Sequence, residues 1–239
     1  MDDSLFRTPL MRVAGVLWLL AGTLYLTCET IAAAGFPGYS YAHHYISDLG
    51  VSYDGLIHGR ALHSSRAWVM NFGGFVLDGA FYGLATVLAT WAVCRSGWSR
   101  AGAVFMAVSL IHAIGTILVG SVPNGPREVA LGLAPIHLIG AAMAIIGGNA
   151  ALIAAASFSR RFGAPAWYRA VCVGLGLFGF VSLALLEVGG LTGRAILPAG
   201  LLERGAVYPI TVWKIMTGMA IVIARRNSAL RSVPPCART

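Results

Sequence analysis

Stretches of apolar residues alternate with shorter polar segments along the 239-residue chain. Each stretch has roughly the 20 residues that an α-helix needs to cross the hydrocarbon core of a membrane. Glycine and alanine are dense within the stretches, which is typical of helices that approach one another closely in lipid. The pattern predicts an all-α integral membrane bundle, a single domain with six transmembrane helices at about residues 13–34, 67–93, 102–122, 134–158, 170–191 and 207–224.

The composition supports a membrane protein. Hydrophobic residues make up 57% of the chain and charged residues 11%, and the mean hydropathy is +0.75. Soluble domains carry about 25% charged residues, so the composition excludes an ordinary soluble protein. The net charge of +8 is spread over loops and ends, and we expect no nucleic-acid partner. The four cysteines lie in different segments without CxxC spacing, so neither a disulfide framework nor a thiolate metal site is indicated.

The arginines predict the orientation of the helices. With the N-terminus inside, the cytoplasmic segments hold eleven of the sixteen arginines and the outer segments hold five. Positively charged residues favour the cytoplasmic side. Both termini are therefore predicted to be cytoplasmic in a multi-pass protein of the plasma membrane, with residues 225–239 as a basic tail. The first apolar stretch is longer than that of a usual signal peptide and predicts a retained helix, although TIAAAG resembles a cleavage site.

Ionisable residues occur inside the predicted spans. Such groups are costly in hydrocarbon and mark function by default. At 1.5 Å per residue, Lys214 lies about 10 Å from the outer end of its span, and Asp78 and His112 lie about 15–17 Å deep. No acid, lysine or histidine falls in the inner half of a span. This distribution predicts an outward-facing polar pocket, with a lining drawn from Tyr41, Asn71, Asp78, His112, Asn124, Glu187, Arg204 and Lys214.

Structural roles explain several of these residues without a ligand. Lys214 with either Asp78 or Glu187 is a candidate buried ion pair, and removing one partner of such a pair is costly whatever its role. A lone histidine such as His112 on an apolar helix is more often a hydrogen-bonded core residue than a ligand. Glu29 and His137 lie shallow enough to reach the interface and be solvated. The clustering of the polar residues therefore carries more weight than any single residue.

The polar loop at residues 37–66 is the richest candidate for chemistry. It contains Asp48, Asp54 and four of the six histidines: His43, His44, His58 and His63. Imidazoles and carboxylates are the usual zinc ligands, and a zinc-bound water forms a hydroxide nucleophile near neutral pH. A zinc cofactor is thus one hypothesis, with candidate ligands His43, His44, Asp48 and His137. The candidate catalytic residues are Asp48, His44, His137 and Ser47.

The spacing of these residues matches no strong metal motif, since the chain has no HExxH sequence. The alternative is a polar cap in which Asp48 caps a short helix or accepts hydrogen bonds from Tyr41 or Tyr45.

Two shorter motifs can also be explained without a ligand. Asn124, in a Pro-Asn-Gly turn, lies at the pocket mouth or serves only the turn. The neighbours Glu203 and Arg204 form a local salt bridge, or Arg204 contacts an anionic head group.

Several motifs resemble those of a bacterial membrane family catalogued as domain of unknown function 998. They are AGFPGYS, YISDLG, GSVPNG, HLIGA and GLLERGAVYPITVW, and they extend over most of the chain. The resemblance implies a six-helix bundle that is distantly similar to eukaryotic membrane proteins of lipid-anchor remodelling, without implying an activity. The positions that match the family's motifs are Tyr41, Ser47, Asp48, Gly50, Asn71, Asn124, His137, Glu203 and Arg204.

Three functions stay open at this stage. The first is a membrane protein that binds a lipid or small amphipathic molecule from the outer side, in envelope-related work. The second is a membrane-embedded enzyme, a metal-assisted hydrolase or a lipid- or isoprenoid-modifying enzyme, that uses Asp48 and a histidine. The third is a proton-coupled transporter that uses Asp78, His112 and Lys214 as a relay. The absence of ionisable groups from the inner half of the spans disfavours the transporter.

Overall fold

The computed structural model describes residues 8–57, 60–95 and 97–231. Helices long and apolar enough to span a membrane occur six times in this part of the chain, which confirms the predicted multi-pass fold. Their helical elements are α2 (Pro9–Ala33), η2 (Val69–Leu77) continued by α3 (Asp78–Cys94), α4 (Arg100–Ser121), α6 (Ala134–Phe158) continued by η3 (Ser159–Phe162), α7 (Ala166–Thr192) and α8 (Ala199–Arg231).

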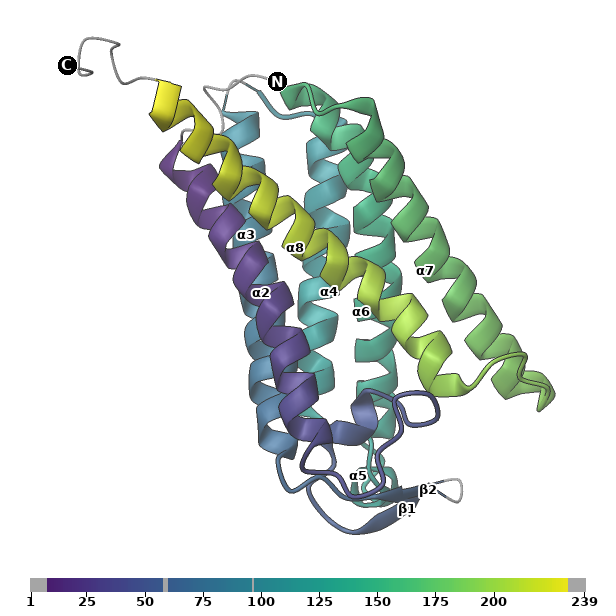
Figure 1. Ribbon diagram of the computed structural model, residues 1–239. Coiled ribbons are helices and arrows are strands. Elements are labelled where there is room, and N and C mark those ends of the chain that lie inside the picture. Colours follow the sequence, from purple (N-terminus) through teal and green to yellow (C-terminus); the bar gives the residue numbers. More distant parts are fainter. Residues whose placement is uncertain (1–7, 58–59, 96, 232–239) are drawn as a thin grey trace.

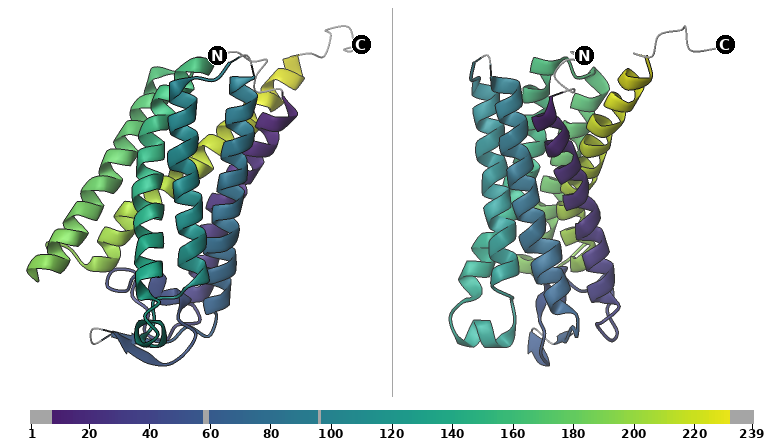
Figure 2. Two further views of the ribbon diagram at one scale, coloured as in Figure 1. Left: turned by 180° about the vertical axis from the view of Figure 1, so that it is seen from behind. Right: turned by 90° about the vertical axis from the view of Figure 1, so that its left-hand side faces the viewer.

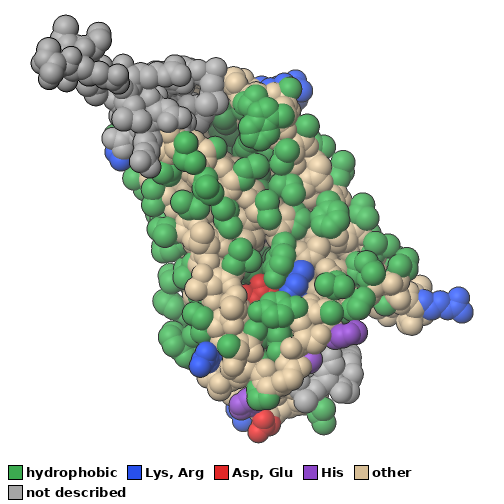
Figure 3. All heavy atoms as spheres, in the orientation of Figure 1, with side chains coloured by type: hydrophobic (Ala, Val, Ile, Leu, Met, Phe, Trp, Pro, Cys, Tyr) green, Lys and Arg blue, Asp and Glu red, His purple; other side chains and the backbone are tan. Residues whose placement is uncertain are grey.

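The helices form a bundle with two distinct ends (Figures 1 and 2). Helices α3, α4 and α6 stand side by side, α2 and α8 cross their face, and α7 lies along one edge. The start of α2 and the end of α8 lie at one end of the bundle, and the loop between α2 and η2 covers the other. Hydrophobic side chains cover most of the face formed by α2 and α8, and histidines gather near the loop end (Figure 3).

Local sequence signals fix the helix ends. The Thr8 side chain accepts a hydrogen bond from the backbone N–H of Met11, and Ser99 caps α4 through Gly102 in the same way. At the other ends, Gly163 and Gly193 adopt left-handed backbone conformations, with φ of 66° and 68°. Glycine tolerates this conformation and commonly ends helices.

Small residues allow α4 and α6 to pack closely. A Cβ atom added to Gly115 of α4 would lie 2.6 Å from the backbone oxygen of Gly140 on α6. Contact at that distance excludes a larger residue at position 115. This is the small-residue packing that the sequence led us to expect for helices in lipid.

The last helix is longer than predicted. It begins at Ala199 rather than at 207 and continues to Arg231, so residues 225–231 belong to a helix rather than to a tail. Glu203 and Arg204 were predicted to lie in the loop before the last span, yet both lie inside α8. Lys214 is consequently about 22 Å along its helix, deeper than the prediction from the shorter span.

The loop between the first two spans is folded onto the bundle. It contains a one-turn 3₁₀ helix, η1 (Ser47–Gly50), and a short antiparallel hairpin of β1 (Gly55–Ile57) and β2 (Arg60–Leu62), in which Gly55 pairs with Leu62. Leu49 and Val51 are completely buried in a cluster that includes the end of α2. Apolar burial of this kind holds the loop against the helices.

Candidate functional site

A cavity of about 700 Å³ lies in the half of the bundle nearest the loop. All six spans contribute to its wall, and the loop contributes Tyr45, Ile46 and Ser47. Most of the wall is apolar, with side chains such as Phe75, Leu183 and Ile210. Seven of the candidate catalytic and pocket residues line the cavity: Ser47, Asp78, His112, Asn124, His137, Glu187 and Lys214.

A buried ion pair forms the deepest polar part of the wall. Lys214 Nζ on α8 donates a hydrogen bond of 2.6 Å to Asp78 Oδ1, and both residues are only 1% exposed. Of the two partners considered for Lys214, the structure therefore selects Asp78. Asp78 lies where the wide π-helical turns of η2 end and α3 begins, and such π segments are frequent at functional sites.

Several polar atoms in this wall have no hydrogen-bond partner among the residues that the structure describes. Asp78 Oδ2, His112 Nε2 and Thr211 Oγ1 are buried without a hydrogen bond, and each belongs to a residue that lines the cavity. Leaving a buried polar group unpaired costs about 1–3 kcal/mol. The described residues therefore leave the hydrogen-bonding capacity of these three atoms unused.

The hydrogen bond of His112 assigns its tautomer. His112 Nδ1 lies 2.7 Å from the backbone oxygen of Ala144, and its ring packs edge-on against Tyr82. A carbonyl oxygen only accepts, so Nδ1 carries the proton and Nε2 of the neutral ring is an acceptor. A structural role for His112 thus explains the hydrogen bond made by Nδ1. It does not explain why Nε2 has no hydrogen-bond partner among the described residues.

The wall nearer the loop is more polar. His137 Nδ1 lies 2.7 Å from the backbone oxygen of Val122, and Glu203 accepts a hydrogen bond from the backbone N–H of Ile46. His137 is 3% exposed, so the expectation that it is solvated at the interface is wrong. Glu187, on α7, is exposed and has no hydrogen bond or ion pair to the described residues.

The cavity reaches the lipid-facing surface between α6 and α7. Three apolar lining residues are exposed there: Leu138 is 59% exposed, Ile146 49% and Leu191 86%. Helix α7 diverges from α6 toward the loop end of the bundle (Figure 1). The cavity thus has exposed apolar residues on its α6 and α7 sides.

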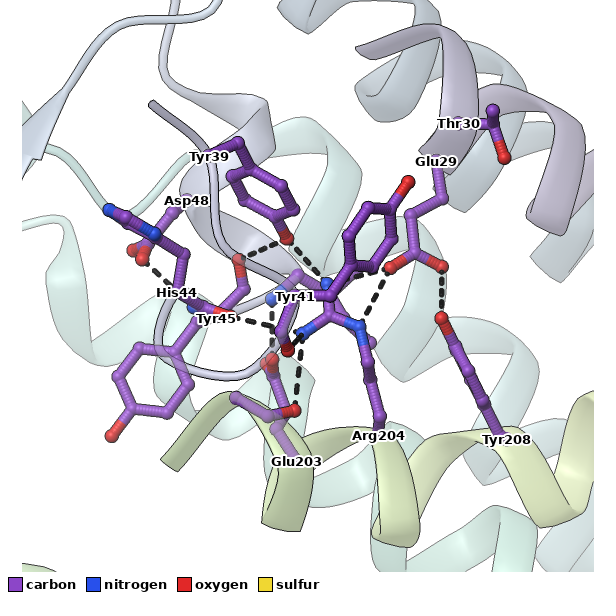
Figure 4. A network of polar contacts seen from close by, with 12 residues as sticks. Glu29, Thr30, Tyr39, Tyr41, His44, Tyr45, Asp48, Glu203, Arg204 and Tyr208 are labelled. Atoms are coloured by element: carbon purple, nitrogen blue, oxygen red, sulfur yellow. Dashed lines mark hydrogen bonds and ion pairs between the residues drawn. The ribbon is translucent and has the colours of Figure 1, made fainter. Parts of the chain in front are cut away.

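Arg204 organises a second polar cluster outside the cavity (Figure 4). Its Nε and Nη2 atoms donate to Glu29 Oε1 at 3.1 and 2.8 Å. Nη2 also donates to the Tyr39 hydroxyl, and Nη1 donates to the backbone oxygens of Tyr41, His44 and Gly200. All five N–H groups of the guanidinium therefore have acceptors within the protein.

This cluster corrects two predictions. Arg204 pairs with Glu29 on α2 rather than with the neighbouring Glu203. Glu29 is only 1% exposed and also accepts a hydrogen bond from the Tyr208 hydroxyl, so it is not solvated at the interface. Arg204 ties the start of α8 to α2 and to the loop.

Tyr39 is a neutral phenol that links Arg204 to the loop through its hydroxyl group. Burial raises the pKa of Tyr39 above its ordinary value, while the neighbouring Arg204 lowers it by a smaller amount. The protonated hydroxyl donates to the backbone oxygen of Tyr45 at 3.1 Å and accepts from Arg204 at 2.5 Å. Tyr39 lies in the AGFPGYS motif, but the sequence analysis assigned it no role.

The proposed catalytic residues divide into two groups. Ser47 and His137 line the cavity, whereas Asp48 and His44 do not. Asp48 Oδ2 accepts from the backbone N–H of Tyr45 at 2.9 Å, as the polar-cap interpretation predicts. His44 Nδ1 accepts from the backbone N–H of Ser40 at 3.0 Å, and its ring stacks on Tyr39.

Other predicted residues lie outside the cavity. The Asn71 side chain donates to the backbone oxygen of Gly50 at 2.8 Å and joins η2 to the loop. The Tyr41 ring lies 4.8 Å from the Arg204 guanidinium carbon, and His43 is exposed. His58 lies outside the described residues.

No group of three or more His, Cys, Asp or Glu side chains suited to a metal occurs in the part of the chain that the structure describes. His43, His44, Asp48 and His137 therefore do not form the zinc site that the sequence suggested. His63 lies 3.0 Å from Asp54 instead, in a solvent-accessible pair. The zinc hypothesis finds no support among these residues.

Comparison with protein-family models matches residues 19–220 to the family described as Protein of unknown function (DUF998). The chain belongs to this family. The resemblance noted in the sequence is thereby confirmed. Comparisons with curated proteins and with solved structures found no match.

Proposed function

We propose that this DUF998 protein binds a lipid or another amphipathic molecule in the cavity. The observation that carries the proposal is the combination of an apolar wall with unpaired polar atoms on Asp78, His112 and Thr211. Ligand sites are typically concave and mostly apolar, with a few polar groups that orient the ligand. The volume of about 700 Å³ lies within the usual range of roughly 300–1,000 Å³.

The lateral opening supports an amphipathic ligand. Leu138 and Leu191 line the cavity and are exposed on the surface that faces lipid. An alkyl chain between α6 and α7 stays in contact with apolar groups, while the head group reaches Asp78 and Lys214. We place the cavity and the loop on the outer side of the plasma membrane, because arginines are more frequent on the opposite side. This placement suits envelope-related work.

The proposal is tested by measuring the lipid that co-purifies with the protein in mild detergent. Ala141 lines the cavity, whereas Ala80 is exposed and does not line it. Ala141→Phe fills the cavity and is expected to lose the co-purifying lipid that wild type retains. Ala80→Phe makes the same change elsewhere and is expected to retain it. Equal lipid content in the folded wild type and Ala141→Phe proteins would contradict the proposal.

An enzyme acting on the bound molecule is the second candidate. Ser47 and His137 from the original catalytic set both line the cavity near the loop, where a hydroxyl and an imidazole are reasonable acid–base partners. His137→Gln is then expected to abolish turnover of the bound lipid without releasing it. Unchanged lipid after prolonged incubation with wild type would exclude this activity for that lipid. The structure places Lys214 just past the middle of its span, Ala199–Ile223, so the expectation that no lysine lies in the half away from the loop does not hold, and we propose no transport function.

A further inference from the structure

The polar atoms of the cavity restrict the head group that it accepts. We propose that the site selects an uncharged head group with a free hydroxyl, as in a diacylglycerol or a long-chain alcohol. This inference rests on the proposed function, because it concerns the same cavity. It follows from which unpaired atoms donate and which accept, and from the charges around them.

The deep wall requires a hydrogen-bond donor. Asp78 Oδ2 only accepts when its carboxylate is paired with Lys214, and His112 Nε2 accepts because Nδ1 donates to Ala144. Both atoms are unpaired, and both residues are more than nine-tenths buried. A ligand that lacks an O–H or N–H group would leave both acceptors without a partner.

The same wall also offers donors. Lys214 Nζ has three N–H groups, and the structure uses one of them for Asp78 Oδ1. The unpaired Thr211 hydroxyl both donates and accepts. A hydroxyl head group meets both kinds of partner, because it donates its one proton to Asp78 Oδ2 or His112 Nε2 and accepts a hydrogen bond from Lys214 or Thr211.

The charged residues of the cavity disfavour anionic and cationic head groups. The cavity is lined by three acidic residues, Asp78, Glu187 and Glu203, and by one basic residue, Lys214. An anionic phosphate would meet these carboxyl groups and has no arginine in the described lining. An ammonium group would donate to Asp78 but would lie beside the Lys214 ammonium, and like charges at short range repel strongly in a low-dielectric site.

Four lipids with identical oleoyl chains test the inference on the purified full-length protein. They are dioleoylglycerol, its acetate ester without the hydroxyl, dioleoyl phosphatidic acid, and the protonated amine dioleoyl dimethylaminopropane. Their dissociation constants are measured by native mass spectrometry in one detergent. Dioleoylglycerol is expected to bind at least about tenfold more tightly than the other three, which corresponds to the loss of one or two hydrogen bonds.

A threonine pair supplies the matched control. Thr211 and Thr90 are both buried with unpaired hydroxyls, and only Thr211 lines the cavity. Thr211→Val is expected to weaken dioleoylglycerol binding about five- to tenfold and to leave the acetate ester unchanged. Thr90→Val is expected to leave both unchanged.

The outcomes separate the two proposals. Phosphatidic acid, the amine or the acetate ester binding as tightly as dioleoylglycerol would overturn the hydroxyl inference and leave lipid binding intact. Equal dioleoylglycerol affinity in wild type and Thr211→Val would also overturn it. If none of the four lipids binds and no lipid co-purifies, the proposed function itself fails.

Discussion

Helix α8 contributes to two buried ion pairs, which differ in how many of their polar atoms have hydrogen-bond partners within the protein. Arg204 pairs with Glu29, and Lys214 pairs with Asp78 ten residues later. All five N–H groups of Arg204 have acceptors within the protein. Asp78 Oδ2 has none, and its neighbours His112 and Thr211 also have unpaired atoms. Every residue of the two pairs is at most 5% exposed, so burial does not explain why one pair has all its hydrogen bonds and the other does not.

The surroundings of each pair explain the difference. Arg204 lies beside backbone carbonyls of the folded loop, and the planar guanidinium fork matches several acceptors at once. Lys214 lies deeper, between the aromatic rings of Tyr25 and Tyr82 at 5.3 and 6.0 Å. The first environment completes its hydrogen bonds internally. The second adjoins the cavity, and Asp78 Oδ2 has no hydrogen-bond partner among the described residues.

The largest effect is expected from Arg204. Arg204→Met leaves Glu29 unpaired in a buried site and should lower the free energy of unfolding by about 3–5 kcal/mol. Glu29→Leu in the same chain should not restore stability, because carbonyls of the loop lose their donor as well. Thermal unfolding in detergent measures both variants. Arg127→Met is the control, since this exposed arginine only stacks on Tyr53 and should cost no more than about 1 kcal/mol.

For the Asp78–Lys214 pair, unlike the Arg204–Glu29 pair, the double variant should recover most of the stability that the single variant loses. Lys214→Met alone leaves a buried carboxylate and should cost about 3–5 kcal/mol. Adding Asp78→Leu removes the orphaned charge and should return the free energy of unfolding to within about 2 kcal/mol of wild type. The same unfolding assay measures the change. If the Arg204 double variant recovered as fully as this one, the contrast between the two pairs would fail.

A smaller effect is expected where the loop rests on α8. A Cβ atom added to Gly200 would lie within 3 Å of the backbone oxygens of Tyr41, Ala42 and His44. Gly200→Ala should therefore displace the loop and cost about 1–3 kcal/mol. Gly174→Ala is the matched control, because no atom lies within 4 Å of its added Cβ. It should be neutral or stabilising by up to about 1 kcal/mol.

The smallest effect is expected at the hairpin. The Tyr53 hydroxyl lies 2.5 Å from Glu128 and accepts from the backbone N–H of Arg127. Tyr53→Phe should cost about 1 kcal/mol, whereas Tyr41→Phe keeps the ring over Arg204 and should stay within about 0.5 kcal/mol of wild type.

The effect of Tyr53 should depend on pH. Burial and the Glu128 hydrogen bond raise the pKa of Tyr53 above its ordinary value. Its stabilising contribution is therefore complete below pH ~10 and is lost as pH rises through the folded-state pKa. The stability difference between wild type and Tyr53→Phe should shrink above pH ~10, and a constant difference would contradict this assignment.

The pattern of hydrophobic and polar residues predicted the six-helix fold. It did not predict most of the hydrogen-bond and ion-pair partners of the polar residues. The six spans, and the grouping of Asp78, His112 and Lys214 around one cavity, were predicted from residue type and position in apolar stretches. The start of α8 was missed because Glu203–Arg204 resembles a loop until Glu29, 175 residues from Arg204, supplies its partner. Thr211 was missed because a neutral hydroxyl in an apolar span carries no signal.

The most direct test of the account is the lipid content of the Asp78→Leu, Lys214→Met double variant, measured by native mass spectrometry beside wild type. We expect the double variant to unfold within a few degrees of wild type, because the pair contributes little to the stability of the fold. We also expect it to lose its co-purifying lipid, because the pair binds the head group. A folded double variant that keeps the same lipid at the same occupancy would contradict the assignment of this cavity as the binding site.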